Sequence, residues 1–182
     1  VAVLLLIQHP VVAAEAIEEI EVIGITPGGT QQDVRKLPYA VQSAIGADLE
    51  AAQALDLSDF MNQRLGSVNI NSAQNNPLQP DVQYRGFTAS PLLGLPQGLS
   101  VYQNGVRINE PLGDAVNWDL LPESAISKIE LVSGSNPVFG LNTLGGALGL
   151  TMKNGFNFTG RQVEAVSGSW DRLTGTLESG GN

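Results

Sequence analysis

The clearest alternation of hydrophobic and polar positions falls in two segments on either side of a glycine- and asparagine-rich stretch. In the first segment Ile129 and Leu131 alternate with Lys128 and Glu130, and in the second leucine and methionine alternate with glycine, threonine and lysine. A period of two is typical of strands with one buried face. Glycine makes tight turns at lower cost than residues with a Cβ atom. The pattern therefore predicts two half-buried strands joined by a turn within residues 126–155.

Shorter patterns upstream predict helices and strands in alternation. Residues 57–65 have the apolar spacing of a helix, with Ser58 as its N-cap and Gly66 as its stop. Residues 47–54 contain good helix formers. A helical turn with Pro122 near its start leads into the first of the two strands above. Further strands are predicted at residues 37–45, 68–70, 82–87 and 99–109.

Turns and loops separate these elements. The dipeptide Asn104-Gly105 is the sequence most typical of a two-residue type I′ hairpin turn. Polar, proline- and glycine-rich composition marks three loops, at residues 72–80, 88–98 and 109–118. Near the end of the chain, residues 161–170 and 172–179 alternate weakly about a short turn. Strands of about 9–11 residues of this kind are typical of transmembrane β-hairpins.

The N-terminal segment, residues 1–16, begins with an apolar run and ends in Ala14-Glu15-Ala16, an A-x-A cleavage pattern. This arrangement predicts the end of a secretory signal peptide. The alternative is a short buried strand at the start of a domain. The apolar run is too short for a membrane-spanning helix, which needs about 20 apolar residues.

Residues 17–30 alternate charged and apolar side chains and then run into Pro27-Gly28-Gly29. An extended segment beside a flexible spacer can pair its backbone with the edge of another protein's sheet. The alternative is an ordinary first strand.

Composition restricts the class of protein. A chain of 182 residues can form one ordinary domain with a small appendage, and its 21 glycines and 10 prolines favour short strands and loops. The net charge of −9 argues against sequence-independent binding to nucleic acid phosphates. The absence of cysteine excludes disulfides and thiolate metal sites.

Catalytic patterns are missing. The one histidine, His9, lies in the expected signal segment, so the mature chain has no histidine for catalysis or for zinc. The glycine-rich turn at residues 140–146 lacks the Lys-Ser/Thr pair of a phosphate loop. The acidic residues show no spacing for general acid and base work. We therefore expect no enzyme, no metal site and no cofactor.

Several motifs occur in one order along the chain. They are Arg85-Gly86-Phe87, the Asn-Gly-Val turn, a Leu-Pro pair before an Ile-Glu strand, and a Gly-Gly-Ala-Leu-Gly-Leu strand that ends in Lys-Asn-Gly. In this order they resemble the plug domain of TonB-dependent outer-membrane receptors. The resemblance implies an α+β plug with a small mixed sheet and short helices at residues 31–155. It also implies a signal-peptide remnant at 1–16, a TonB box with a flexible linker at 17–30, and the first strands of a truncated β-barrel at 156–182.

The resemblance also implies roles for individual residues. The TonB box, which binds the periplasmic domain of TonB, falls on Glu19, Ile20, Glu21, Val22 and Ile23. Arg85 and Glu130 are expected in the lock between plug and barrel, with Arg85 paired to Glu130 if their strands are neighbours and otherwise to barrel glutamates. Ser133 departs from the family, which often has a second arginine there. The loops expected to face the ligand contribute Asn75, Asn76, Gln97, Asn109 and Trp118.

As a receptor part, the plug would occlude a barrel in the outer membrane of a Gram-negative bacterium and help to capture a scarce extracellular small molecule. A ferric siderophore or other metal chelate is the expected ligand, and the implied partners are TonB and, through the barrel, outer-membrane lipid. No nucleic acid partner is expected. The alternative is a soluble periplasmic binding or adaptor domain without a barrel, which would leave the two transmembrane-like strands unexplained.

Overall fold

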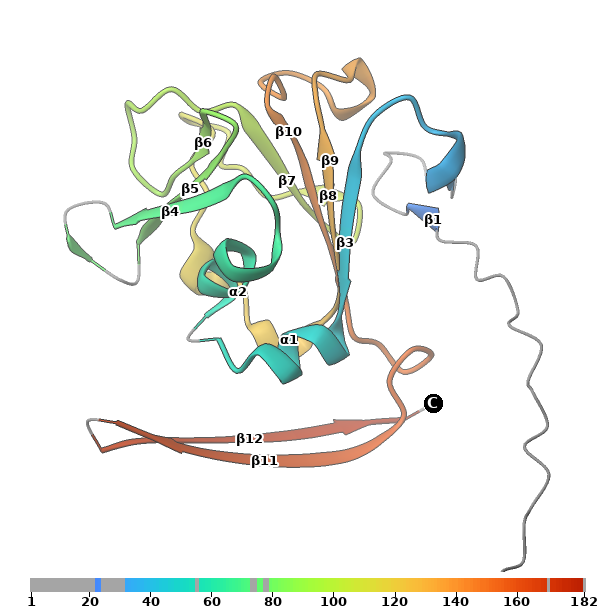
Figure 1. The fold of residues 1–182 in the computed structure, drawn as a ribbon, viewed down its shortest axis with the longest axis vertical. Helices are drawn as coiled ribbons and strands as arrows, with labels where there is room; N and C mark the ends of the chain where they lie inside the picture. Colours follow the sequence, from blue (N-terminus) through green and yellow to red (C-terminus); the bar gives the residue numbers. More distant parts are fainter. Residues whose placement is uncertain are drawn as a thin grey trace, which may run out of the picture.

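The computed structural model describes residues 22–23, 32–54, 56–72, 75–76, 79–169 and 171–181 (Figure 1). Within these ranges the chain has an α+β fold, built from a five-stranded mixed sheet, a three-stranded sheet, two small two-stranded sheets and two α-helices. The helices are α1 (Gly46–Ala52) and α2 (Leu57–Arg64). No helix among the described residues is long and apolar enough to cross a membrane.

The five-stranded sheet has the order β3-β9-β10-β7-β8. Its strands are β3 (Val41–Ile45), β9 (Ile126–Ser133), β10 (Gly146–Met152), β7 (Leu99–Gln103) and β8 (Val106–Arg107). Strands β9 and β10 form the predicted antiparallel hairpin at its centre, and β10 also pairs with β7 in parallel. The predicted turn at Asn104-Gly105 joins β7 to β8, with φ of 49° and 80° at its two residues.

The two central strands are buried on both faces, so the expectation of half-buried strands was wrong. One face of the hairpin contributes Leu131 and Leu148 to the main hydrophobic cluster. The other face contributes Val132 and Ala147 to a smaller cluster with Phe139. The charged residues that suggested a solvated face include Glu130, whose burial is almost complete.

A second sheet and α2 cover one face of the large sheet. This sheet has the order β4-β5-β6 and consists of β4 (Val68–Ser72), β5 (Pro80–Tyr84) and β6 (Phe87–Ala89). Phe60 and Met61 of α2 are buried in the same cluster as the central hairpin. The predicted helix is confirmed, but its N-cap is Asp56, whose carboxylate accepts a hydrogen bond from the backbone N–H of Asp59 at 2.9 Å, and Ser58 lies inside the helix.

The segment expected to be one strand at residues 82–87 is broken by a turn. Strand β5 ends at Tyr84, and Arg85 and Gly86 make the turn to β6 with φ of 50° and 85°. Arginine is uncommon at positive φ. The alternating pattern therefore predicted one continuous strand and gave no sign of a turn at Arg85.

Two small sheets complete the described structure. Strand β1 (Val22–Ile23) pairs with β2 (Gln32–Asp33). Strands β11 (Gly160–Gly168) and β12 (Arg172–Gly180) form the antiparallel pair expected near the end of the chain, and they lie beneath α1 in Figure 1.

Candidate functional site

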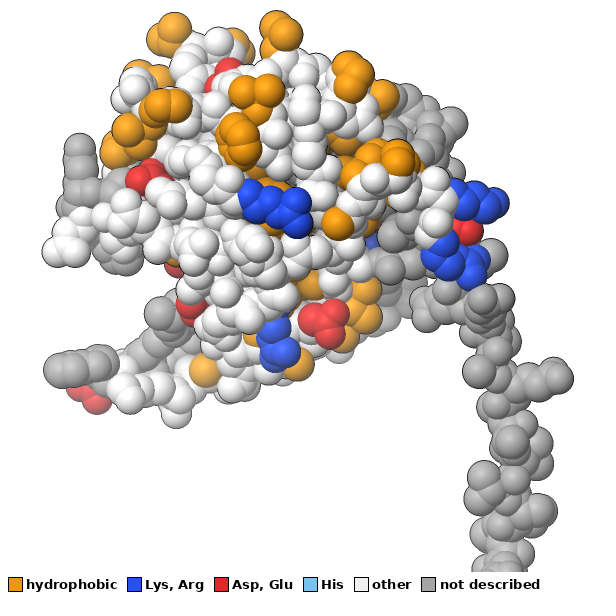
Figure 2. Space-filling view, turned by 45° about the horizontal axis from the view of Figure 1, so that its top comes forward, with side chains coloured by type: hydrophobic (Ala, Val, Ile, Leu, Met, Phe, Trp, Pro, Cys, Tyr) orange, Lys and Arg blue, Asp and Glu red, His pale blue; other side chains and the backbone are white. Residues whose placement is uncertain are grey.

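Three loops meet at the end of the large sheet that is uppermost in Figure 1, and we call them the loop surface: residues 88–98, 109–117 and 134–145. Backbone hydrogen bonds join them. The N–H of Val116 donates to the carbonyl of Ser90 at 2.9 Å, and that of Gly145 donates to the carbonyl of Gly98 at 2.9 Å. Figure 2, turned so that this end comes forward, shows hydrophobic side chains spread over it and few charged groups. The third loop was not expected to belong to this surface.

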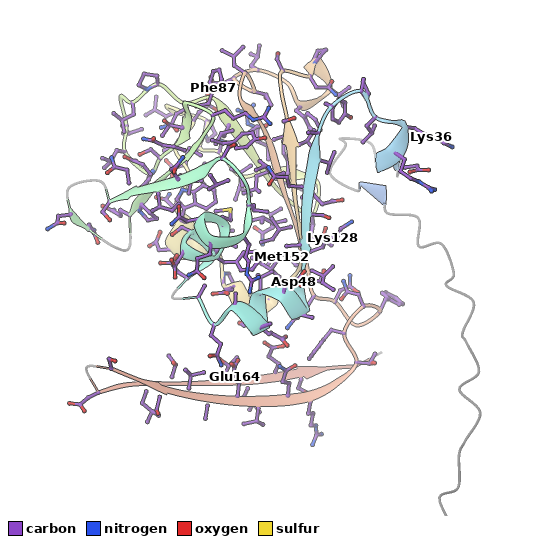
Figure 3. All side chains as sticks on the ribbon, in the orientation of Figure 1. Lys36, Asp48, Phe87, Lys128, Met152 and Glu164 are labelled. Atoms are coloured by element: carbon purple, nitrogen blue, oxygen red, sulfur yellow. The ribbon has the colours of Figure 1, made fainter. Side chains whose placement is uncertain are left out.

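Phe87, at the upper end of the core in Figure 3, anchors the loop surface. A Cβ atom added to Gly98 would lie 2.6 Å from the Phe87 ring, and one added to Gly145 would lie 2.5 Å from the Phe87 Cβ atom. Real Cβ atoms essentially never make contacts this short, so a side chain at either position would displace Phe87 or the loop. The phenylalanine of the Arg-Gly-Phe motif thus fastens two of the loops to the small sheet.

A polar group that we call the Arg107 cluster ties the second loop to the third. Its members are Arg107, Asp114 and Asn142. The Arg107 guanidinium donates from Nη2 to Asp114 Oδ1 at 3.0 Å and from Nη1 to the carbonyl of Leu141 at 2.8 Å. The other carboxylate oxygen of Asp114 accepts from Asn142 Nδ2 at 2.9 Å. Because charge-assisted hydrogen bonds are stronger than neutral ones, the two loops are held as one unit.

Three of the polar residues expected to face a ligand brace these loops from within. Asn109 is buried, and its side chain accepts from the N–H of Val101 at 2.7 Å and donates to the carbonyl of Leu99 at 3.1 Å. Trp118 is buried in the main core and donates from Nε1 to the carbonyl of Ala89 at 3.1 Å. Gln97 accepts from the N–H of Ser90 at 2.8 Å through Oε1.

Asn75 and Asn76 belong to the loop between β4 and β5, where residues 73–74 and 77–78 lie outside the described ranges. Asn75 is exposed and has a φ of 59°. The side chain of Asn76 donates to Gln79 Oε1 at 3.2 Å. Of the five residues, Asn75 therefore has the most accessible side chain.

Arg85 and Glu130 do not come from neighbouring strands, because β5 and β9 belong to different sheets. Arg85 is exposed in the turn after β5, with its guanidinium 5.1 Å from the centre of the Tyr84 ring. Glu130 is buried, and its Oε1 lies 3.0 Å from Lys128 Nζ on the same strand. The condition for pairing Arg85 with Glu130 inside the domain is not met.

The predicted TonB-binding segment lies mostly outside the described residues. Glu19, Ile20 and Glu21 are not described. Val22 and Ile23 form β1, which pairs in register with Asp33 and Gln32 of β2. Because Val22 and Ile23 already pair as a strand, their backbone can adopt the extended form that pairing with another sheet requires.

Lys153 joins the large sheet to the β11–β12 hairpin, and sequence patterns gave no sign of it. Its Nζ atom lies 2.7 Å from Glu178 of β12 and 3.2 Å from Glu50 of α1. Burial disfavours the charged form of Lys153, but hydrogen bonds to Glu178 and then to Glu50 outweigh burial and raise its pKa above the usual 10.5. Beside this junction, between α1 and the hairpin, is a cavity of about 290 Å³. Its lining includes Glu164, which is labelled on the hairpin in Figure 3.

The described residues include no group of three or more His, Cys, Asp or Glu side chains that could hold a metal ion.

Comparison with known proteins gave one family match and many fold matches. The model of the TonB-dependent Receptor Plug Domain matches residues 33–147. The search of curated proteins found no match. Among solved structures, the pyoverdine outer membrane receptor FpvA from Pseudomonas aeruginosa PAO1 matches with a TM-score of 0.63 at 16% identity, covering 86% of this chain and 21% of its own.

Two further receptors share the fold. The alcaligin outer membrane receptor FauA from Bordetella pertussis matches with a TM-score of 0.60 at 17% identity, covering 86% of this chain and 25% of its own. The Serratia marcescens hemophore receptor HasR matches with a TM-score of 0.58 at 16% identity, covering 78% of this chain and 22% of its own. The chain thus spans about a quarter or less of each of these receptors.

Proposed function

The chain belongs to the TonB-dependent receptor plug domain family, and from this premise we propose that it is the plug of an outer-membrane receptor that imports a scarce extracellular ligand with energy from TonB. The observation that carries the proposal is the family match over residues 33–147. In this proposal residues 31–155 form the plug, and residues 156–182 begin the barrel wall. Exposed Val163, Leu173 and Leu177 on β11 and β12 support the second part, because strands of a transmembrane barrel turn apolar side chains toward lipid.

The proposed TonB-binding segment comprises Glu19, Ile20, Glu21, Val22 and Ile23. Main-chain hydrogen bonds carry the binding of an added strand, and proline removes a donor and fixes φ. In cells that express the full-length receptor, Val22→Pro should therefore abolish uptake of radiolabelled ferric chelate, whereas Val22→Ala should reduce it little. Normal uptake by Val22→Pro would overturn the TonB-coupled function.

Arg85 is the proposed contact between plug and barrel. Its exposure in a turn supports a partner outside the described residues. Glu130, which is buried beside Lys128, is the second residue proposed for the lock. Arg85→Ala should leave unfolding of the 182-residue chain almost unchanged and should impair uptake by the full receptor. Arg85→Lys is the matched control, because it keeps the charge and loses the bidentate geometry. Unchanged uptake by Arg85→Ala would show that Arg85 is a solvated surface charge.

A ferric siderophore or other metal chelate is the proposed ligand. The receptors with the same fold include one bound to pyoverdine, one for alcaligin and one in complex with a hemophore and heme. The loop surface is the proposed plug contribution to the ligand site, and Asn75 and Asn76 of the β4–β5 loop are proposed as further ligand contacts. Asn109, Trp118 and Gln97 would act by holding the loops in place.

A further inference from the structure

We propose that Asn154 is a site of spontaneous deamidation, a modification that places a new carboxylate in the connection between β10 and the β11–β12 hairpin. The sequence contains two Asn-Gly dipeptides, Asn104-Gly105 and Asn154-Gly155. Their hydrogen bonds differ, and the second dipeptide is the reactive one. This chemistry does not depend on the proposed transport function.

Deamidation begins when the backbone nitrogen of the following residue attacks the side-chain amide carbon of asparagine. At Asn154 the new bond joins the nitrogen of Gly155 to Cγ, and this nitrogen loses its proton to a solvent base. Nδ2 takes a proton from solvent and leaves as ammonia, and water then opens the cyclic imide at either carbonyl to give aspartate or isoaspartate. Because Gly155 has no Cβ atom, its backbone reaches the required arrangement more easily than that of other residues.

Two backbone N–H groups hold the side-chain oxygen of Asn154. Its Oδ1 atom accepts from the N–H of Phe156 at 2.9 Å and from the N–H of Asn157 at 3.1 Å. Negative charge develops on this oxygen when Cγ is attacked, and donors at such distances stabilise an oxyanion. The N–H of Gly155 donates to no acceptor among the described residues, so the attacking nitrogen gives up no hydrogen bond.

Asn154 lies in an exposed turn on the connection that leads from the lower end of the large sheet to the hairpin in Figure 1. Its carbonyl accepts from the N–H groups of Asn157 and Phe158 at 3.2 and 2.9 Å, and Phe156 between them is 86% exposed. These bonds are made within residues 154–158, so closure of the imide ring disturbs one short turn. Local opening of an exposed turn requires much less free energy than global unfolding.

Asn104 is held by the large sheet instead. Its N–H donates to the carbonyl of Leu150 at 2.8 Å, and its Oδ1 atom accepts from the N–H of Met152 at 2.9 Å. Both partners belong to β10, at the centre of the sheet. The imide ring contains the Cα–C and Cα–Cβ bonds of the asparagine, so Cγ and the following nitrogen must lie on the same side. To reach that arrangement Asn104 would leave its hairpin turn and lose its bonds to β10.

The two products have different consequences for the hairpin. Aspartate at position 154 keeps the acceptor oxygen in place, and its charge strengthens the bonds from the two N–H groups. Isoaspartate inserts a methylene group into the backbone directly after Lys153, whose Nζ atom donates to Glu178 of β12 at 2.7 Å. We therefore expect isoaspartate, and not aspartate, to lower the protection of β12 against hydrogen exchange.

Mass spectrometry of the aged protein tests the proposal. The purified protein is incubated at mildly alkaline pH and digested with pepsin in acid, and the conversion of amide to acid is followed at each asparagine. We expect Asn154 to convert at least about tenfold faster than Asn104, a difference of about 1.4 kcal/mol in the barrier. Equal rates, faster conversion of Asn104, or no conversion of Asn154 would overturn the proposal.

The denatured protein is the control that separates structure from sequence. Both asparagines precede glycine, so in concentrated guanidinium chloride they should convert at similar rates. A ratio of rates that is the same in the denatured and the folded protein would show that the fold does not select Asn154, and the proposal would fail.

A pair of variants tests the role of the N–H donors. Phe156→Pro removes one of the two donors to Oδ1 and should slow conversion of Asn154, whereas Phe156→Ala keeps the N–H and should convert at the unmodified rate. Misfolding would loosen the turn and speed conversion, so it cannot produce the expected result. Faster conversion in Phe156→Pro, or equal rates in the two variants, would show that the donors do not promote the reaction and would overturn the proposal.

Discussion

Two antiparallel hairpins of similar alternating sequence have different environments in this molecule. In β9–β10, Leu131 is 3% exposed, whereas in β11–β12 Leu177 is 77% exposed. The first hairpin has β3 and β7 on its two sides and apolar clusters on both faces, and the second pairs only with itself among the described strands. An isolated two-stranded hairpin is marginally stable in water. The contrast teaches that alternation predicts the strand, whereas the neighbours of the strand decide its burial.

The largest expected difference between the hairpins comes from matched glycines on their second strands. A Cβ atom at Gly146 of β10 would lie 2.3 Å from the carbonyl oxygen of Val132, whereas one at Gly175 of β12 would approach nothing closer than 3.9 Å. Gly146→Ala should therefore destabilise the chain by more than about 4 kcal/mol or prevent folding, and Gly175→Ala should be nearly neutral. Denaturant unfolding followed by circular dichroism checks both variants. Similar midpoints for the two would contradict the described register.

Leucine truncation on the two hairpins should give the next largest difference. Leu131→Ala removes a buried side chain from the main cluster, which typically costs about 2–5 kcal/mol. Leu177→Ala removes an exposed one and should change the free energy of unfolding by less than about 0.5 kcal/mol. The same unfolding measurement gives both values. A large loss from Leu177→Ala would mean that β12 is covered in solution.

Local signals in the sequence were sufficient for much of the fold. The central hairpin, helix α2 and the Asn104-Gly105 turn follow from periodicity, a helix stop and a turn dipeptide, and the structure contains all three. The Arg85-Gly86 turn was missed because arginine gives no signal for positive φ. The Arg107 cluster and the Lys153 junction could not be predicted, because they join distant segments, as in the contact of Lys153 with Glu50 across 103 positions. Such contacts depend on the order of the strands in the sheet, and the alternation of hydrophobic and polar residues does not encode that order.

Substitutions of turn residues at positive φ should give smaller differences in stability between the large sheet and the exposed hairpin. Gly105 joins two strands of the large sheet with φ of 80°, and Asp171 lies in the turn of the exposed hairpin with φ of 55°. A β-branched residue fits this conformation poorly, so Gly105→Val should destabilise the chain by about 1–2 kcal/mol. Asp171→Val should fray the β11–β12 hairpin and leave the main transition unchanged. Hydrogen exchange resolves the two outcomes, and global loss of protection from Asp171→Val would show that the hairpin stabilises the core.

The smallest effect is expected at Lys153, which follows β10 and forms ion pairs with Glu178 of the second hairpin and with Glu50 of α1. Partly exposed ion pairs contribute about 0–1 kcal/mol, so Lys153→Met should destabilise the chain by no more than about 1 kcal/mol at neutral pH. The pKa of Lys153 is raised in the folded chain. This contribution is therefore fully present below the ordinary lysine pKa of 10.5 and disappears as the pH rises through the higher folded value. The free energies of unfolding of the unmodified chain and of Lys153→Met should converge at alkaline pH. Lys153→Arg keeps its charge there, so it should remain more stable than Lys153→Met. Pulse hydrogen exchange on β12 across this range measures the convergence directly, and protection of β12 that does not depend on pH in the unmodified chain would show that the ion pair with Glu178 does not hold the hairpin against α1.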